Sequence, residues 1–422
     1  MSDLDHVTAD GAPDAAQDLD LERLLSLDLD DPVIRANPYP HYDRMRELAP
    51  IAPSPIEDRH WILTRFADCE AVLRDPRWSS NPTHRPLPPP DQADVRQNMA
   101  AMDAHILLFI DPPDHTRLRK LMSKAFTPRT VEKLRPRVKE IVDEILDQAA
   151  QRGELDVVAD LGYIVPVTVI CEMIGVPVED RDLFGPWSSD ASRLLDGVLD
   201  EETTMRGLGG AMQIINYLNQ LIEDHRAHPR DDLLSALIAA EEEGDRLTED
   251  ELRTNLLLLF VAGHETTMNL IGNGTYALLQ NPAQLDRLRQ EPDLISSTVE
   301  ELLRWDGPVH VTGRVATEDG LVIGGQEFAR GDQVITHIAA ANRDPERFPG
   351  ADTLDIGRND SHHLAFSLGI HYCLGAALAR LEGQVAIGAL VERFPTMTIL
   401  TNPVEYRDHF VLRGLKELRV SV

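Results

Sequence analysis

The stretch that decides the fold lies near the carboxyl end, where residues 366–375 read FSLGIHYCLG and lead directly into AALARLEGQVAIGALVERF at 376–394. The second segment is typical of a long helix, so Cys373 stands just before a helical amino terminus. Backbone N–H groups and the helix dipole favour a thiolate at such a position. A thiolate is a good axial ligand for iron, although an isolated cysteine would ordinarily be interpreted as a buried structural thiol.

Three neighbours of Cys373 add to the case for a ligand loop. Gly369 and Gly375 would let the backbone turn tightly and approach a flat ring closely, because they carry no Cβ. Phe366 could shield the sulfur from water and oxidation. The pattern therefore indicates a thiolate that holds a planar metal group.

Composition sets the outer limits. With 422 residues and 42% hydrophobic content, the chain can bury a large core in one big domain or in two fused ones. A formal net charge of -30 argues against general affinity for nucleic acid or for anionic membranes. The three cysteines, Cys69, Cys171 and Cys373, form neither a disulfide framework nor a CxxC pair, which favours a reduced cytoplasmic protein.

The amino terminus lacks the basic and apolar regions of a signal peptide, so residues 1–30 are predicted to be a mobile acidic tail before a single domain at 31–422. The longest apolar run that stands out, Leu256 to Ala262, is far shorter than the roughly 20 residues that cross a bilayer. We therefore expect no membrane anchor.

The hydrophobic spacing predicts a mainly α protein with small β-sheets. From about Pro112 the chain is mainly helical, as in TVEKLRPRVKEIVDEILDQAA at 130–150. The strand-like segments are HWILTRF at 60–66, GLVIGGQEFARGDQVITHIAA at 320–340 and FVLRGLKELRVSV at 410–422. A proline-rich region from about Arg77 to His105 is predicted to be a loop.

A second stretch of interest is LLLLFVAGHETT at 256–267, an apolar helix that small and polar residues interrupt. Buried polar groups need partners, since each unsatisfied one costs about 1–3 kcal/mol. The structural interpretation is a helix leaving the core, or a threonine hydroxyl bonded to the carbonyl one turn earlier. The functional interpretation is a ligand groove beside which Glu265 and Thr266 manage protons.

A third pattern is ExxR, in which Glu301 and Arg304 share one helical face and can pair. Exposed ion pairs of this kind are common, so the pattern alone is weak evidence for a functional site.

Taken in order, these motifs resemble those of the cytochrome P450 family. The decapeptide is similar to the haem-binding loop FxxGxHxCxG of its bacterial members. Upstream, the chain also resembles the family at DPPDHTRLRK, AGHETT, ExxR, and ANRDPERF followed by LDIGR, so the resemblance runs from about Asn37 to the carboxyl terminus. One departure is Ser367, where glycine is frequent.

The resemblance implies a P450 fold with haem b between a distal and a proximal helix, and Cys373 as the iron ligand. Peptide N–H groups around Leu374 and Gly375 would temper the charge of the sulfur. By the same resemblance, Glu265 and Thr266 deliver protons while O2 is activated. Glu301, Arg304 and Arg358 would form a structural salt-bridge triad.

The resemblance also implies haem contacts beyond the sulfur. His115 and Arg119 lie one turn apart on one face of the helix after Pro113, and with Arg314 and His371 they match family ligands of the propionates. The full set of cofactor-binding residues is then His115, Arg119, Arg314, Phe366, His371, Cys373 and Gly375.

Arg117, Lys120 and Lys124 fall on the opposite face of the same helix. A solvated basic stripe usually serves solubility alone. In so acidic a chain, a stripe beside the haem is also a plausible docking site for an acidic ferredoxin or flavodoxin. No reductase motif is fused to the chain, so electrons from NAD(P)H would arrive through separate proteins. We expect a monomer.

The implied reaction is insertion of one oxygen atom of O2 into a small apolar organic molecule by hydroxylation or epoxidation. Leu258, Ala262 and His310 are candidate pocket residues, although core packing explains the first two equally well. Family analogy favours a secondary metabolite such as a polyketide or terpenoid, with fatty-acid or steroid hydroxylation as the alternative.

Two other classes compete with a monooxygenase. A non-catalytic haem- or carrier-binding relative is disfavoured by the intact acid and alcohol pair at 265 and 266. A zinc site of His362, His363, His371 and Cys373 fits no common spacing and leaves the other motifs unexplained.

Overall fold

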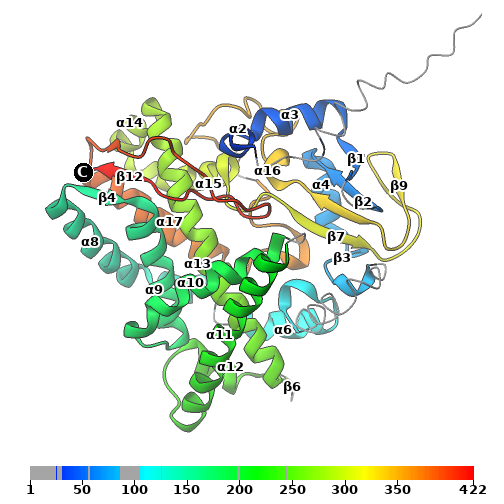
Figure 1. Ribbon diagram of the computed structural model, residues 1–422, viewed down its shortest axis with the longest axis horizontal. Coiled ribbons are helices and arrows are strands. Elements are labelled where there is room, and N and C mark those ends of the chain that lie inside the picture. The colour runs from blue at the N-terminus through cyan, green and yellow to red at the C-terminus, as the bar shows by residue number, and fades with distance from the viewer. Residues whose placement is uncertain are drawn as a thin grey trace, which may run out of the picture.

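The computed structural model describes Leu25 and residues 31–55, 58–85, 105–124, 126–196, 200–242, 245–360 and 362–422. Most of the predicted tail at 1–30, and the proline cluster at 86–90, lie outside these described residues. Figure 1 shows a helix-rich part beside a smaller, sheet-rich part. The prediction of a mainly α fold with small β-sheets is confirmed.

The helices occupy most of the described chain and vary from one turn to more than eight. The amino-terminal ones are α2 (Pro32–Ala36), α3 (Tyr39–Leu48), α4 (Phe66–Arg74), α6 (Asp114–Ser123), α7 (Pro128–Glu132) and α8 (Arg135–Arg152). The middle ones are α9 (Ile164–Ile174), α10 (Arg181–Ser192), α11 (Glu201–Ala227), α12 (Leu233–Ala239) and α13 (Glu249–Gln280). The last are α14 (Pro282–Gln290), α15 (Ile295–Asp306), α16 (Ile338–Ala341) and α17 (Ala376–Arg393).

The strands form one five-stranded sheet and three smaller ones. The large sheet has the order β1 (Ile51–Pro53), β2 (His60–Leu63), β10 (Gln333–Thr336), β7 (Thr312–Ala316) and β3 (Trp78–Ser79), and only the β2–β10 pair is parallel. A second sheet has the order β11 (Thr398–Ile399), β12 (Arg419–Ser421) and β4 (Glu154–Asp156). The hairpins are β5 (Glu241–Glu242) with β6 (Asp245–Arg246), and β8 (Leu321–Ile323) with β9 (Gln326–Phe328).

Helix α13 runs through the centre of the helical part (Figure 1) and packs against α9, α10, α11, α15 and α17. It begins with a capping box, in which the Thr248 hydroxyl accepts from the Glu251 N–H and the Glu251 carboxylate accepts from the Thr248 N–H. The helix continues unbroken through Ala262 and Gly263 to Gln280. Small residues here thin the helix surface without breaking its hydrogen bonds.

Sequence spacing located the long helices and strands better than their ends. The helix expected at 130–150 is divided into α7 and α8 at residues 133–134. Of the terminal segment 410–422, only Arg419–Ser421 is a strand. One stretch, Val157–Ile174, has the length and hydropathy of a membrane span, but 67% of it is buried inside the fold, as in the core helix of a globular protein.

Two hydrophobic cores meet at the predicted ligand loop. Phe366 packs in the large core of the helices, whereas Leu364 and Leu368 pack in the smaller core beneath the five-stranded sheet. The loop is thereby held from both sides before it enters α17.

Candidate active site

The loop that presents Cys373 is closed by backbone contacts. The Cys373 N–H donates to the Phe366 carbonyl at 2.9 Å, so the segment between them forms a tight arch. Ser367 and Gly369 both have left-handed backbone, with φ of 57° and 67°. A Cβ at Gly369 would lie 2.5 Å from the Leu73 carbonyl oxygen, so only glycine fits there. Beside Gly375 nothing lies within 4 Å of a would-be Cβ, which leaves space for the close approach of a flat ring.

The electrostatics of Cys373 differ from the sequence expectation. The residue keeps accessible surface, yet protein atoms surround it closely enough that burial raises the pKa of its thiol. The N–H groups of Gly375 and Ala376 and the charges of Arg119 and Arg380 lower that pKa, but they do not outweigh burial. The N–H donors toward the sulfur are those of Gly375 and Ala376.

Behind the loop, Arg380 of α17 joins the sulfur environment to the ExxR helix. Its guanidinium donates to both oxygens of Glu300, at 2.6 and 2.9 Å, and to the Tyr372 hydroxyl at 3.0 Å. The same group stacks 4.4 Å from the centre of the Phe366 ring. Burial raises the pKa of Glu300, but hydrogen bonds from His363 and Arg380 lower it to about 2, so this carboxylate is ionised.

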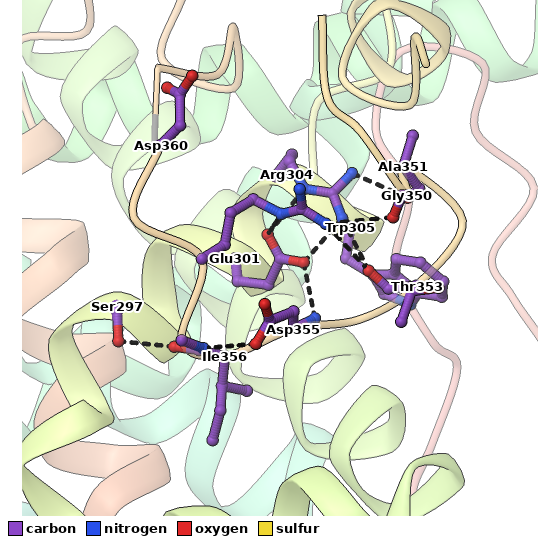
Figure 2. Close-up of polar contacts among 12 residues, drawn as sticks. Ser297, Glu301, Arg304, Trp305, Gly350, Ala351, Thr353, Asp355, Ile356 and Asp360 are labelled. Atoms are coloured by element: carbon purple, nitrogen blue, oxygen red, sulfur yellow. Dashed lines mark hydrogen bonds and ion pairs between the residues drawn. The ribbon is translucent and has the colours of Figure 1, made fainter.

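The ExxR pair is one of the most deeply buried polar groups in the described chain. Arg304 donates to both oxygens of Glu301, at 2.7 and 2.8 Å, and both side chains are 1% exposed. Arg358 donates to the same carboxylate at 3.1 Å, as does the Asp355 N–H at 2.9 Å. The structure thus brings the three predicted triad residues together, and Figure 2 shows the Glu301–Arg304 pair at the centre of the group.

The remaining donors of Arg304 hold the segment that follows the large sheet. They reach the carbonyls of Asn342 at 2.9 Å, Ala351 at 3.0 Å and Thr353 at 3.4 Å. Removing one partner of so buried a pair costs about 3–5 kcal/mol, because the other charge is left uncompensated. The triad acts on structure, through the loop that leads to Cys373.

The four predicted propionate ligands also come together. The rings of His115 and His371 lie 4.5 Å apart, and Arg119 and Arg314 both depress the pKa of His371, after burial, to about 3. The Nε2 atom of His371 lies 2.8 Å from the Ser80 hydroxyl, a contact that no sequence motif predicted.

This cluster fits an anionic cofactor. Both ring nitrogens of His115 are buried without a hydrogen-bond partner among the described residues. Burial lowers the pKa of Arg314 to about 10 and lowers that of Arg119, and neither guanidinium has a carboxylate partner within the described chain. Buried cations are normally paired. Two propionates of a haem would satisfy these donors, with Cys373 positioned as the iron ligand.

On the distal side, α13 turns one stripe of its surface away from the core. Ala262 is exposed in the middle of a buried helix, and Leu258 and Thr266, one turn before and after it, are half-buried. The Thr266 hydroxyl donates to the Ala262 carbonyl at 2.7 Å, as the structural interpretation of the sequence required. The oxygen keeps its lone pairs on this stripe, so the two interpretations are compatible.

Glu265 points elsewhere. It is 2% exposed, and its carboxylate accepts from Arg407 at 3.0 Å. His264 lies 3.9 Å from the other oxygen. The sequence analysis did not identify Arg407, because Arg407 lies 142 positions after Glu265 in a segment with no motif. Glu265 and Thr266 are neighbours in sequence but face different surroundings.

Another buried acid was missed. Glu382 of α17 is 1% exposed, and one of its oxygens has no partner among the described residues. Burial raises its pKa to about 8, against a small opposing effect of a hydrogen bond from Thr267 of α13. A single glutamate in a helical pattern gives no sequence signal of this kind.

The predicted docking stripe on α6 needs one correction. Arg117 is half-buried and forms an ion pair with Glu251 at the start of α13, and it lies 3.6 Å from Asp114. It serves as an internal tie between helices. Lys120 and Lys124 are exposed, on the side of α6 opposite His115.

His310, expected in the substrate pocket, is 4% exposed, and its Nδ1 lies 2.9 Å from the Tyr42 hydroxyl. The zinc alternative fails on geometry, since His363 bonds to Glu300 and His371 to Ser80. Within the described ranges, no group of three metal-ligating side chains is brought together.

Comparison with known proteins agrees with this architecture. A family model described as Cytochrome P450 matches residues 83–418. The vitamin D(3) 25-hydroxylase of Pseudonocardia autotrophica is 42% identical over 391 residues, which is 92% of this chain and 94% of that protein. The polyketide biosynthesis cytochrome P450 PksS of Bacillus subtilis (strain 168) is 39% identical over 397 residues, or 92% and 96% of the two chains. The crystal structure of myxobacterial cytochrome P450 CYP267B1 in complex with myristic acid has a TM-score of 0.84 at 36% identity, covering 93% of this chain and 98% of that one.

A cysteine loop before the proximal helix, a long distal helix and a cluster of buried cations define a haem-thiolate monooxygenase. The chain belongs to the cytochrome P450 family. As in that family, it uses haem and O2, takes electrons from redox partners and oxidises small molecules.

Proposed function

We propose that this chain, as a single domain from residue 31, hydroxylates or epoxidises a lipophilic secondary metabolite such as a polyketide or terpenoid. The observation that carries the haem assignment is the pair of buried guanidinium groups without carboxylate partners, Arg119 and Arg314, beside the unpartnered ring of His115. Haem b, held by Cys373 and by propionate contacts to these side chains, supplies oxygen activation when bound.

The residues of the chain divide the remaining tasks. Arg380 opposes the charge of the sulfur, and its guanidinium stacks on the Phe366 ring. Thr266 holds a hydroxyl on the exposed stripe of α13, and the Ala262 carbonyl orients it. Glu265 lies one residue away and is joined through Arg407 to a part of the surface that admits solvent, since the Arg407 side chain is 24% exposed. Glu265 would pass protons to the stripe after its side chain turned from Arg407 toward Thr266.

Relatives with similar sequences support the substrate class only by analogy. One is named for polyketide biosynthesis, another for vitamin D(3) hydroxylation, and a structural relative binds myristic acid. Fatty-acid or steroid oxidation is therefore the second candidate. Titration of the haem protein with a compound library tests both, since a substrate that displaces the water ligand shifts the Soret band. A library in which only steroids and fatty acids shift the band would overturn the first candidate.

Electrons would arrive from a ferredoxin or flavodoxin reduced by NAD(P)H, in the cytoplasm. The docking face would centre on Lys120 and Lys124, which are exposed, whereas Arg117 is half-buried against Glu251. Charge reversal of both lysines should slow association with an acidic ferredoxin and flatten its salt dependence, because screening acts over about 8 Å at physiological ionic strength. Stopped-flow reduction under carbon monoxide measures this. Equal rates and salt slopes for the double variant and the parent would remove the assignment.

A further inference from the structure

A cavity beside α3 is lined mostly by side chains with no assigned part in the oxidation site. It is small, with about 20 Å³ of room for the centres of water-sized groups, and it is partly open to solvent. The polar residues of its wall are Arg35, Tyr42, His310, Arg407, His409 and Arg413. Among the described residues that line it, none is acidic, although the chain as a whole has a net charge of -30. The wall therefore combines three guanidinium groups with hydrogen-bond donors. Figure 1 shows α2 and α3 at this side of the molecule.

The carboxylates that pair with the basic side chains of the wall do not line the cavity. The pairs are Arg35 with Asp408 at 3.7 Å, Arg407 with Glu265 at 3.0 Å, His409 with Asp196 at 3.1 Å and Arg413 with Asp306 at 2.8 Å. Arg413 and His409 are deeply buried, whereas Arg35 and Arg407 keep 24% of their side-chain surface exposed. Because Arg35 and Arg407 are only partly covered, each can accept a second anion from the cavity side.

His310 supplies a second, independent observation. Its ring lines the cavity, its Nδ1 is occupied by the Tyr42 hydroxyl, and its Nε2 is buried without a partner among the described residues. Burial, with a smaller effect of Arg413, depresses the pKa of His310 well below its ordinary value, so the ring is neutral. When Tyr42 donates to Nδ1, the proton resides on Nε2, which is then a hydrogen-bond donor that needs an acceptor.

Two lining residues connect the cavity to other parts of the chain. Arg407 lies between the cavity and Glu265, the residue before Thr266 on α13. His310 stands two residues before β7, the strand that carries Arg314 of the propionate cluster.

We propose that this cavity is a subsite for a carboxylate, bound by Arg35, Arg407 and the Nε2–H of His310. The inference rests on the proposed function and refines it, since it assigns the chain an organic acid as ligand. The carboxylate belongs either to the substrate itself or to a separate small acid, and the two sources differ in their effect on the haem spectrum.

The test compares dodecanoate with dodecan-1-ol, which has the same chain without the charge, by Soret titration of the haem protein. Arg35→Gln and His310→Asn should each weaken dodecanoate about tenfold and leave dodecan-1-ol unchanged, because each removes one charge-assisted hydrogen bond. His310→Asn retains a side-chain amide near Nδ1 for Tyr42 but removes Nε2. His310→Gln, which places an amide near Nε2, is the matched control and should retain most of the affinity.

Calorimetry with butyrate separates the two sources. Heat of binding to the parent without a Soret shift, lost in Arg35→Gln, assigns the site to a separate acid. A charge-dependent Soret shift with dodecanoate assigns it to the substrate. Equal affinities of acid and alcohol in all variants, with no heat from butyrate, would overturn the proposal. In that case the reduced haem protein would still give the long-wavelength Soret band with carbon monoxide. If the proposed function were wrong, that band would be absent. Arg35 is partly exposed, so its variant tests the idea even if the His310 variants fail to fold.

Discussion

Arg407 donates to the buried carboxylate of Glu265 across 3.0 Å, and so ties the carboxyl-terminal segment to the middle of the central helix. We predict that Arg407→Gln destabilises the protein by about 1–3 kcal/mol, because it leaves a buried acceptor without its charged donor. Glu265→Gln in the same background should recover most of that loss. Urea unfolding of the two single variants and the double variant measures the coupling. Additive losses would show that the pair contributes nothing of its own.

Thr266 and Thr267 offer a matched pair on one helix. Thr266 lies on the exposed stripe, whereas Thr267 faces Glu382 on the proximal side. We predict that Thr266→Ala preserves the substrate-induced spectral shift but diverts reducing equivalents to hydrogen peroxide. Thr267→Ala should keep the coupling of the parent. Product formed per NAD(P)H consumed decides the matter, and unchanged coupling in Thr266→Ala would refute the proton-delivery assignment.

The three cysteines provide their own control. Cys373→Ala should lose the long-wavelength Soret band of the reduced carbon monoxide complex, from which the family takes its name, because that band requires a thiolate ligand. Cys171 is buried in the helical core, and Cys171→Ala should retain the band. A Cys373→Ala protein that kept it would place the iron ligand elsewhere.

Glu382 predicts an unusual pH dependence of stability. Its folded pKa is raised to about 8 from an ordinary value near 4.5, so the folded state retains a proton that the unfolded state has lost. The stabilising effect of that proton is complete below pH 4.5 and is lost as the pH rises to 8. Relative to Glu382→Gln, the parent should lose roughly 1 kcal/mol of unfolding free energy per pH unit in this window and no more above it. Parallel pH profiles for the two proteins would mean that Glu382 titrates normally.

Ser367 has the backbone of a glycine. At φ 57° it lies in the left-handed region, and its buried hydroxyl has no partner among the described residues. We predict that Ser367→Gly raises the free energy of unfolding by about 1 kcal/mol, since left-handed backbone costs an L-residue roughly 1–2 kcal/mol. Ser367→Ala removes only the hydroxyl and keeps the backbone cost. If alanine stabilises as much as glycine, the hydroxyl and not the backbone is responsible.

The sequence predicted those parts of the site that depend on local spacing. The ExxR pair, the loop before α17, and the shared face of His115 and Arg119 all follow from helical geometry, and a resemblance to known motifs ordered them. The sequence could not predict contacts between segments that are distant along the chain. The partner of Glu265 comes from residue 407, and the partner of His371 comes from Ser80. No periodicity encodes such pairings.

Burial decided the remaining differences. The position of Cys373 before a helix suggested an acidic thiol, but the surrounding protein raises its pKa. Arg117 lay on the outer face by angle alone, yet Glu251 draws it inward. The residue spacing along a helix predicts which way a side chain points. Whether that side chain reaches solvent depends on the helix packed beside it.

The loop held from both sides has a consequence for motion. Leu364 and Leu368 belong to the core beneath the sheet, and Phe366 between them belongs to the core of the helices. The segment therefore connects the two hydrophobic cores, and sliding of one core past the other would displace the Cys373 sulfur. A movement that separates the two cores is therefore expected to leave this segment nearly fixed.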